Sequence, residues 1–147
     1  MSKKAWLKYG IYIILLLTFI LLKELVMNKL NYLYTRNWGA GNSYFLFITI
    51  PLIFNLTIGM LIGLEHFVNE IKKTGRWKIN IPKLVILGIP SLFLSLAYHI
   101  MSINISFIQM TLWKVASHFE NNFPVFQIIF GYAFITCLYK YQERDMG

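Results

Sequence analysis

The sequence predicts an all-α integral membrane protein, a bundle of four transmembrane helices with short loops and amphipathic segments at the membrane interface. Of its 147 residues, 57% are hydrophobic and only 14% are charged, whereas a soluble domain carries about 25% charged residues. The apolar residues also cluster in four stretches of about 17–25 residues, the length that a helix needs to cross a bilayer core. Buried core helices of a soluble protein would need a polar shell that this chain lacks. The predicted spans of this single domain are 5–22, 43–64, 84–108 and 123–139.

The first span, 5–22, has the basic start and apolar run that are also typical of a signal peptide. Lys23-Glu24-Leu25 follows the apolar run, without the small-x-small pattern of a cleavage site. We therefore expect an uncleaved first helix. Apolar residues at 22, 25, 26, 30 and 33 predict that this helix continues for a turn or two along the outer membrane surface.

The second span, 43–64, contains small and polar residues at intervals of four: Asn55, Gly59 and Gly63. A Gly-x-x-x-Gly pair lets two helix backbones approach closely. Pro51 lies in the same span and leaves the carbonyl of Phe47 without its helical donor. In lipid that carbonyl needs another hydrogen-bond partner.

The third span, 84–108, carries a stripe of small and polar residues along one helical face. The spacings are 3, 4, 4, 3 and 4, and the other faces are apolar. Such a face contacts protein or water rather than lipid. The stripe consists of Gly88, Ser91, Ser95, His99, Ser102 and Ser106.

The second and third spans are antiparallel neighbours in this interpretation, so their two stripes are expected to meet. Matching the midpoints of the spans places Gly63 near Gly88, Gly59 near Ser91, and Asn55 near Ser95, with Pro51 opposite His99. We expect His99 or a neighbouring serine to donate a hydrogen bond to the backbone freed by Pro51.

The fourth span, 123–139, begins after Asn121-Asn122 with Phe123-Pro124, a pattern typical of a helix start. Before this span, residues 113–120 mix apolar with polar and charged side chains, which predicts a second segment at the membrane interface. Each span also has one polar residue near mid-depth, and we expect these to converge inside the bundle, because polar groups facing lipid are costly. They are Thr18, Asn55, His99 and Gln127.

The predicted polar seam between the helices therefore comprises ten residues. It is either a structural hydrogen-bond network that holds the helices together or a proton or small-solute site with His99 as its titrating member. Its members are Asn55, Gly59, Gly63, Gly88, Ser91, Ser95, His99, Ser102, Ser106 and Gln127.

The distribution of cations predicts the orientation of the chain. Ten of the fourteen Lys and Arg residues fall in the N-terminal segment, the middle loop and the tail, so the positive-inside rule places both termini in the cytoplasm. The expected location is the plasma membrane, which in a bacterium is the inner membrane. The cations of the middle loop are expected to contact anionic lipid headgroups, and a loop so short is not expected to bind nucleic acid. These cations are Lys72, Lys73, Arg76, Lys78 and Lys83.

The motifs of common enzymes are missing from the sequence. The single cysteine, Cys137, excludes a dithiol redox couple within the chain. His66 and Glu70 are four residues apart, but one such pair is weak evidence for a metal site, and a solvated helix end with an internal ion pair explains it better. We predict no catalytic residues, no metal and no cofactor.

The sequence favours a non-enzymatic accessory or assembly subunit that packs against copies of itself or against a larger membrane protein. The alternative is a small oligomeric transporter or channel that uses the polar seam around His99. An intramembrane enzyme, in which Ser95 or Ser102 would act with His99, is the weakest hypothesis.

Overall fold

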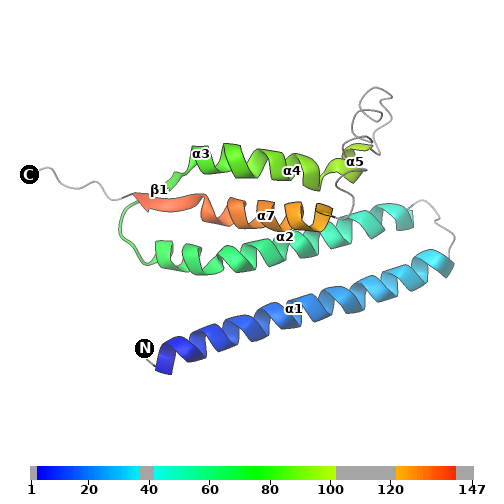
Figure 1. Cartoon of the computed structure of the whole chain (residues 1–147), viewed down its shortest axis with the longest axis horizontal. Helices are drawn as coiled ribbons and strands as arrows, with labels where there is room; N and C mark the ends of the chain where they lie inside the picture. The colour runs from blue at the N-terminus through cyan, green and yellow to red at the C-terminus, as the bar shows by residue number, and fades with distance from the viewer. Residues whose placement is uncertain (1–2, 37–41, 102–121, 142–147) are drawn as a thin grey trace, which may run out of the picture. The chain divides into compact units, whose positions relative to one another are not determined.

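The computed structural model describes residues 3–36, 42–101 and 122–141, and these residues are mostly helical (Figure 1). The chain divides into two compact units, Met1–Phe54 and Asn55–Gly147. Within the described ranges, two helices are long and apolar enough to cross a membrane, over Tyr9–Arg36 and Leu46–Ile71. Two shorter apolar helices follow, over Ile81–Ser95 and Phe123–Thr136.

The first unit pairs α1 (Lys3–Arg36) with the beginning of α2 (Asn42–Ile71). The rings of Phe19 and Phe54 lie 5.3 Å apart, and those of Tyr34 and Phe47 are stacked at the same distance. These contacts make the two segments antiparallel. The helix α1 continues without a break through the predicted amphipathic turn to Arg36, well beyond the predicted end of the span at residue 22.

The third apolar segment is one helical rod with two irregularities. It begins with α3 (Ile81–Lys83), which the side chain of Asn80 caps by accepting a hydrogen bond from the Lys83 N–H at 3.1 Å. A π-helix, η1 (Leu84–Gly88), then leads into α4 (Ile89–Ser95), where Pro90 lies in the first turn. Proline cannot donate to the carbonyl four residues earlier, and a π-turn is one way to accommodate it.

The rod is interrupted at Leu96, whose backbone leaves the helical region with φ −94° and ψ 3° before α5 (Ala97–Met101) begins. The helix predicted over 84–108 is therefore distorted at this point, although the N–H groups of Leu96 and Ile100 still donate to the carbonyls four residues earlier. Residues 102–108 of that span, and the predicted interfacial segment 113–120, lie outside the described residues.

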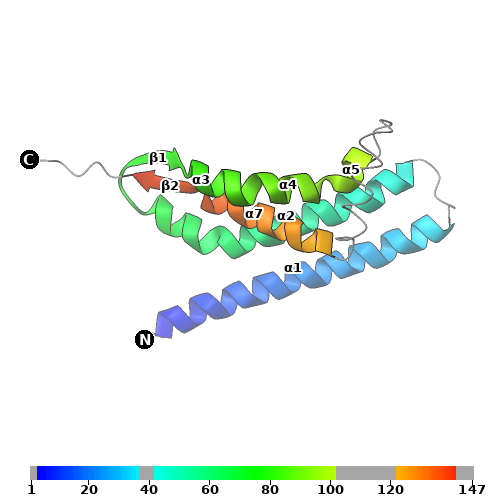
Figure 2. The same ribbon diagram turned by 45° about the horizontal axis from the view of Figure 1, so that its top comes forward.

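The fourth apolar segment forms α7 (Phe123–Thr136), followed by the strand β2 (Leu138–Tyr141). The helix starts where the sequence predicts, although the side chain of Asn122 makes no capping hydrogen bond. The predicted continuation of the span to residue 139 is wrong, because β2 pairs antiparallel with β1 (Arg76–Ile79) of the middle loop. Figure 2 shows this two-stranded ribbon at the end of the helices of the second unit.

The glycines explain how the second unit is held together. A Cβ atom added to Gly59 of α2 would lie 2.1 Å from the carbonyl oxygen of Ile128 in α7, and one added to Gly131 of α7 would lie 2.2 Å from the carbonyl oxygen of Leu56. The backbones of α2 and α7 therefore touch directly, each through a glycine of its own. On its other side α7 packs along η1 and α4.

This packing corrects the predicted helix pairing. Gly59 and Gly63 face α7, not Ser91 and Gly88 of the third segment, and the nearest atoms to Gly63 belong to Ile135 and Thr136. The reason is reciprocity: a backbone-to-backbone contact needs a small residue on both helices, and Gly131 provides the second one.

We predict that Gly131→Ala destabilises the protein, because the added methyl group would collide with the backbone of α2. Overpacking of this kind costs about 1–3 kcal/mol, so the thermal unfolding midpoint in detergent should fall by several degrees. Gly10→Ala is the matched control, since no described residue has an atom within 4 Å of a Cβ atom at Gly10. Equal midpoints for the two variants would contradict the packing described for α2 and α7.

Candidate functional site

The polar seam contains a buried chain of hydrogen bonds that joins three helices. Nδ2 of Asn55 in α2 donates to Oε1 of Gln127 in α7 at 2.6 Å, and Nε2 of Gln127 donates to the backbone carbonyl of Ser95 in α4 at 3.4 Å. The exposed fractions of Asn55, Gln127 and Ser95 are 1%, 6% and 2%. The sequence prediction that Asn55 and Gln127 converge inside the protein is confirmed.

The two described serines of the seam bond within their own helix. The hydroxyl of Ser91 donates to the carbonyls of Leu87 and Gly88, and that of Ser95 donates to the carbonyl of Leu92 at 2.8 Å. Both serines are buried. A serine whose hydroxyl donates a hydrogen bond to the preceding turn of its own helix presents a small surface rather than a reactive group. These two positions therefore let α4 lie close to α7.

The other mid-depth and seam residues do not extend the confirmed part of the prediction. Thr18, which the sequence predicts at mid-depth, is exposed, and its hydroxyl donates to the carbonyl of Ile14 at 2.8 Å. His99 is half-buried on α5, beyond the break at Leu96. Ser102 and Ser106 lie outside the described residues.

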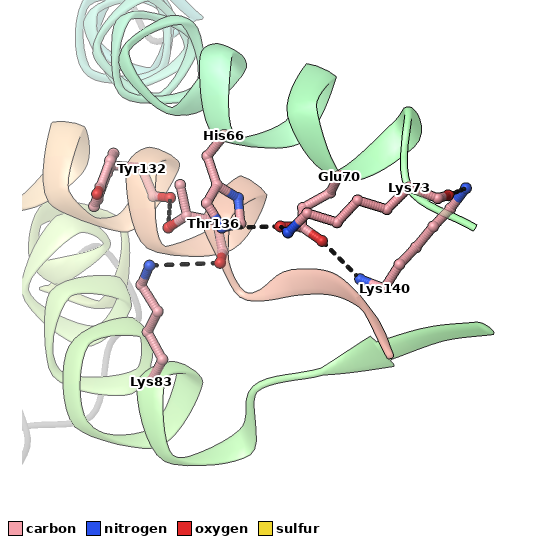
Figure 3. A network of polar contacts seen from close by, with 7 residues as sticks. All are labelled: His66, Glu70, Lys73, Lys83, Tyr132, Thr136 and Lys140. Carbon is pink, nitrogen blue, oxygen red and sulfur yellow. Dashed lines mark hydrogen bonds and ion pairs between the residues drawn. The ribbon is translucent and has the colours of Figure 1, made fainter. Parts of the chain in front are cut away.

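A second polar cluster lies where the helices meet the ribbon, at the end of α2 (Figure 3). Glu70 is only 5% exposed, and its carboxylate accepts hydrogen bonds from Nζ of Lys73 and from the backbone N–H of Lys140 at 2.9 Å. Nε2 of His66 lies 3.9 Å from Oε1 of Glu70. The expectation of a solvated helix end is therefore wrong for Glu70, although His66 and Glu70 do lie close together as that expectation requires.

The environment of Glu70 favours its charged form. The hydrogen bond from Lys73 is the main cause that lowers the pKa of this carboxyl group, the N–H of Lys140 adds to it, and burial acts in the opposite direction. Glu70 lies six residues beyond Leu64, where the predicted membrane span ends. The carboxylate thus fixes β2 to the end of α2 through an interaction between charged and polar groups.

Lysine side chains complete the ends of two helices here. Nζ of Lys140 donates to the carbonyls of Ile71 at 3.0 Å and Lys73 at 2.7 Å, where α2 ends. Nζ of Lys83 donates to the carbonyl of Thr136 at 3.4 Å, at the end of α7 (Figure 3). The last carbonyls of a helix lack donors of their own and carry partial negative charge, so amines stabilise them.

Sequence reasoning missed this cluster because it assigned 138 and 139 to a membrane span. A signal was present in the alternation of Arg76-Trp77-Lys78-Ile79 and Leu138-Tyr139-Lys140-Tyr141, which is typical of strands. The turn before β1 also requires Gly75, whose φ of 135° is rarely adopted by other residues.

No protein-family model matches the chain, and comparisons with curated proteins and with solved structures find no similar protein.

We predict that Asn55 and Gln127 are energetically coupled. In a double-mutant cycle with Asn55→Ala and Gln127→Ala, the coupling free energy should be about 1 kcal/mol, the scale measured for interhelical hydrogen bonds in membrane proteins. Unfolding in detergent measures it. A cycle of Asn55→Ala with Thr35→Ala is the control, because Thr35 is exposed and bonds its own helix, and its effects should add. Additivity in both cycles would contradict the buried chain.

We predict that Glu70→Gln lowers the unfolding midpoint at neutral pH, because the amide cannot pair with Lys73. A lowered pKa means that the stabilisation is present above the unfolded-state pKa, near 4.5, and is lost as the pH falls through the lower folded-state value. The gap between wild type and variant should therefore close on acidification. Glu24→Gln, at an exposed position of α1, is the control. A gap that does not change with pH would refute the assignment.

Proposed function

We propose that the protein is a small multi-pass membrane protein that acts as a non-enzymatic accessory or assembly subunit of a membrane complex. It would lie in the plasma membrane, which in a bacterium is the inner membrane. The chain would cross this membrane four times, with both termini in the cytoplasm. Its partners would be further copies of itself or a larger membrane protein.

The lengths and surfaces of the helices support the membrane location. Tyr9–Arg36 and Leu46–Ile71 are each long enough to cross a bilayer core about 30 Å thick. Large apolar side chains of α1 are exposed, among them Leu7, Ile14 and Leu25. Such a surface needs lipid or another protein to cover it. The pairing of β1 with β2 supports a common side of the membrane for the middle loop and the C-terminal segment.

The observation that carries the subunit proposal is that the described polar groups of the seam form hydrogen bonds within the protein. Asn55, Gln127 and the carbonyl of Ser95 bond to one another, and the described serines bond to their own helix. A pathway for solutes needs polar groups directed into a space that water or solute can enter. Groups that bond one another favour a structural role for the seam.

Oligomeric transport or conduction is the second candidate function, and one atom favours it. Oδ1 of Asn55 is buried and has no hydrogen-bond donor among the described residues. A buried carbonyl oxygen without a donor is costly, and a polar solute or a proton-carrying group would relieve that cost. His99, three helical turns beyond Gly88 on the predicted stripe, would belong to the same pathway.

The test is purification from native membranes through a tag at the C-terminus. A subunit should retain a partner protein at fixed stoichiometry through mild detergent extraction. Recovery of the chain as a homo-oligomer alone would contradict assembly with a different, larger protein.

A flux assay separates the second candidate. The purified protein in liposomes is expected to pass no solute or protons above the background of empty liposomes. Flux that is lost in both Ser95→Leu and His99→Leu would replace the subunit proposal with the transporter.

A further inference from the structure

The two faces of the β1–β2 ribbon differ in chemistry. In an antiparallel pair, opposite residues alternate between hydrogen-bonded and non-hydrogen-bonded pairs. The Asn80 N–H donates to the carbonyl of Cys137 at 2.8 Å, and the Lys140 N–H turns away to Glu70. The pair of Trp77 with Lys140 is therefore a non-hydrogen-bonded one, and its two side chains share a face.

That inner face lies against the end of α2. The ring of Trp77 stacks on Phe67 of α2 with centroids 5.7 Å apart, and Nζ of Lys140 lies 5.2 Å from the Trp77 ring while bonding the carbonyl of Ile71. Ile79 and Leu138 alternate onto the same face by the register of the ribbon.

The outer face of the ribbon consequently carries two cations and two phenols. Arg76 pairs with Tyr141 and Lys78 pairs with Tyr139, and Nζ of Lys78 lies 3.7 Å from the centre of the Tyr141 ring. On this face Arg76 and Lys78 are exposed, Tyr141 is 43% exposed and Tyr139 is half-buried. The neighbouring carboxylate, Glu70, is bound by Lys73 and by the Lys140 N–H, so it does not neutralise this face.

We propose that the outer face of the ribbon, formed by Arg76, Lys78, Tyr139 and Tyr141, binds the phosphate groups of anionic phospholipids. Charge complementarity supports this occupant, and tyrosine beside arginine and lysine is typical of the membrane–water interface. The ribbon directly follows the ends of the apolar helices α2 and α7, which places it at headgroup depth in a spanning protein. This inference rests on the membrane location in the proposed function.

The proposal narrows the set of five lipid-binding cations predicted from the sequence. Lys73 is bound to Glu70, and Lys83 donates to the carbonyl of Thr136 and lies 5.2 Å from the Tyr132 ring. These two lysines serve the fold, and Lys72 is exposed but precedes the ribbon. Arg76 and Lys78 instead share one exposed face, where a guanidinium group can make a bidentate contact with a phosphate.

The test is the thermal unfolding midpoint of the full chain in neutral detergent, with phosphatidylglycerol or phosphatidylcholine added at equal mole fraction. Phosphatidylglycerol should raise the midpoint by several degrees more than phosphatidylcholine. The difference should disappear at about 1 M salt, where the Debye length is about 3 Å. Inorganic phosphate should produce no shift.

The variant Arg76→Gln/Lys78→Gln should lose at least half of the shift given by phosphatidylglycerol. The control is Lys29→Gln/Arg36→Gln, which removes the same two charges from exposed positions of α1 and should keep the full shift. Both doubles are compared with their own lipid-free midpoints, so a change in basal stability does not enter.

Three results would overturn the lipid site. They are an equal loss of the shift in both doubles, an equal shift with inorganic phosphate, and a shift with polyglutamate but not with phosphatidylglycerol. The last would indicate an acidic protein partner. A different experiment tests the membrane location on which the lipid site rests. If that location is wrong, carbonate extraction should release the native protein from the membrane fraction.

Discussion

The direct contact between the backbones of α2 and α7 is the constraint on which the second unit depends. Gly59 and Gly131 each lie against a carbonyl of the other helix, with no room for a methyl group at either position. This contact fixes the axial register of the two helices. With that register, Asn55 lies opposite Gln127 near one end of the contact and Glu70 reaches Lys140 at the other. The small surface of Ser91 and Ser95 then lets α4 approach α7 from the opposite side.

The two polar clusters follow from this register and do different work. In the apolar interior, the amides of Asn55 and Gln127 bond each other and the carbonyl of Ser95 among the described residues, so they specify which three helices meet. At the ribbon, charged groups act where solvent is near. Lys83 and Lys140 supply donors to helix ends. Glu70 holds β2 in place. Among the described residues, each cluster leaves one buried polar atom without a hydrogen-bond partner, Oδ1 of Asn55 in the first and Nδ1 of His66 in the second.

Burial of a single polar residue could be predicted from the sequence. Which two segments pack against each other could not. The convergence of Asn55 and Gln127 was predictable, because a polar side chain at the middle of the membrane must face protein rather than lipid, whichever residue its partner is. The partner of Gly59 was not, because Gly131 stands alone in its span and forms no sequence motif. The ribbon was missed since Leu138 and Tyr139 extend an apolar run, and only pairing with Ile79 and Lys78 makes them a strand. The break at Leu96 has no signal that we recognise.

The central claim is that the polar seam is a dry contact between helices, and cysteine accessibility in native membranes tests it most directly. Cys137, the natural cysteine, is buried and would be replaced by serine. In that background Ser95→Cys changes one atom at the centre of the seam, and Lys78→Cys provides an exposed reference. The account predicts that a charged, water-soluble thiol reagent modifies the cysteine at 78 at once and the one at 95 only after denaturation. Rapid modification at 95 in the native membrane would show that water reaches the seam and would contradict the account.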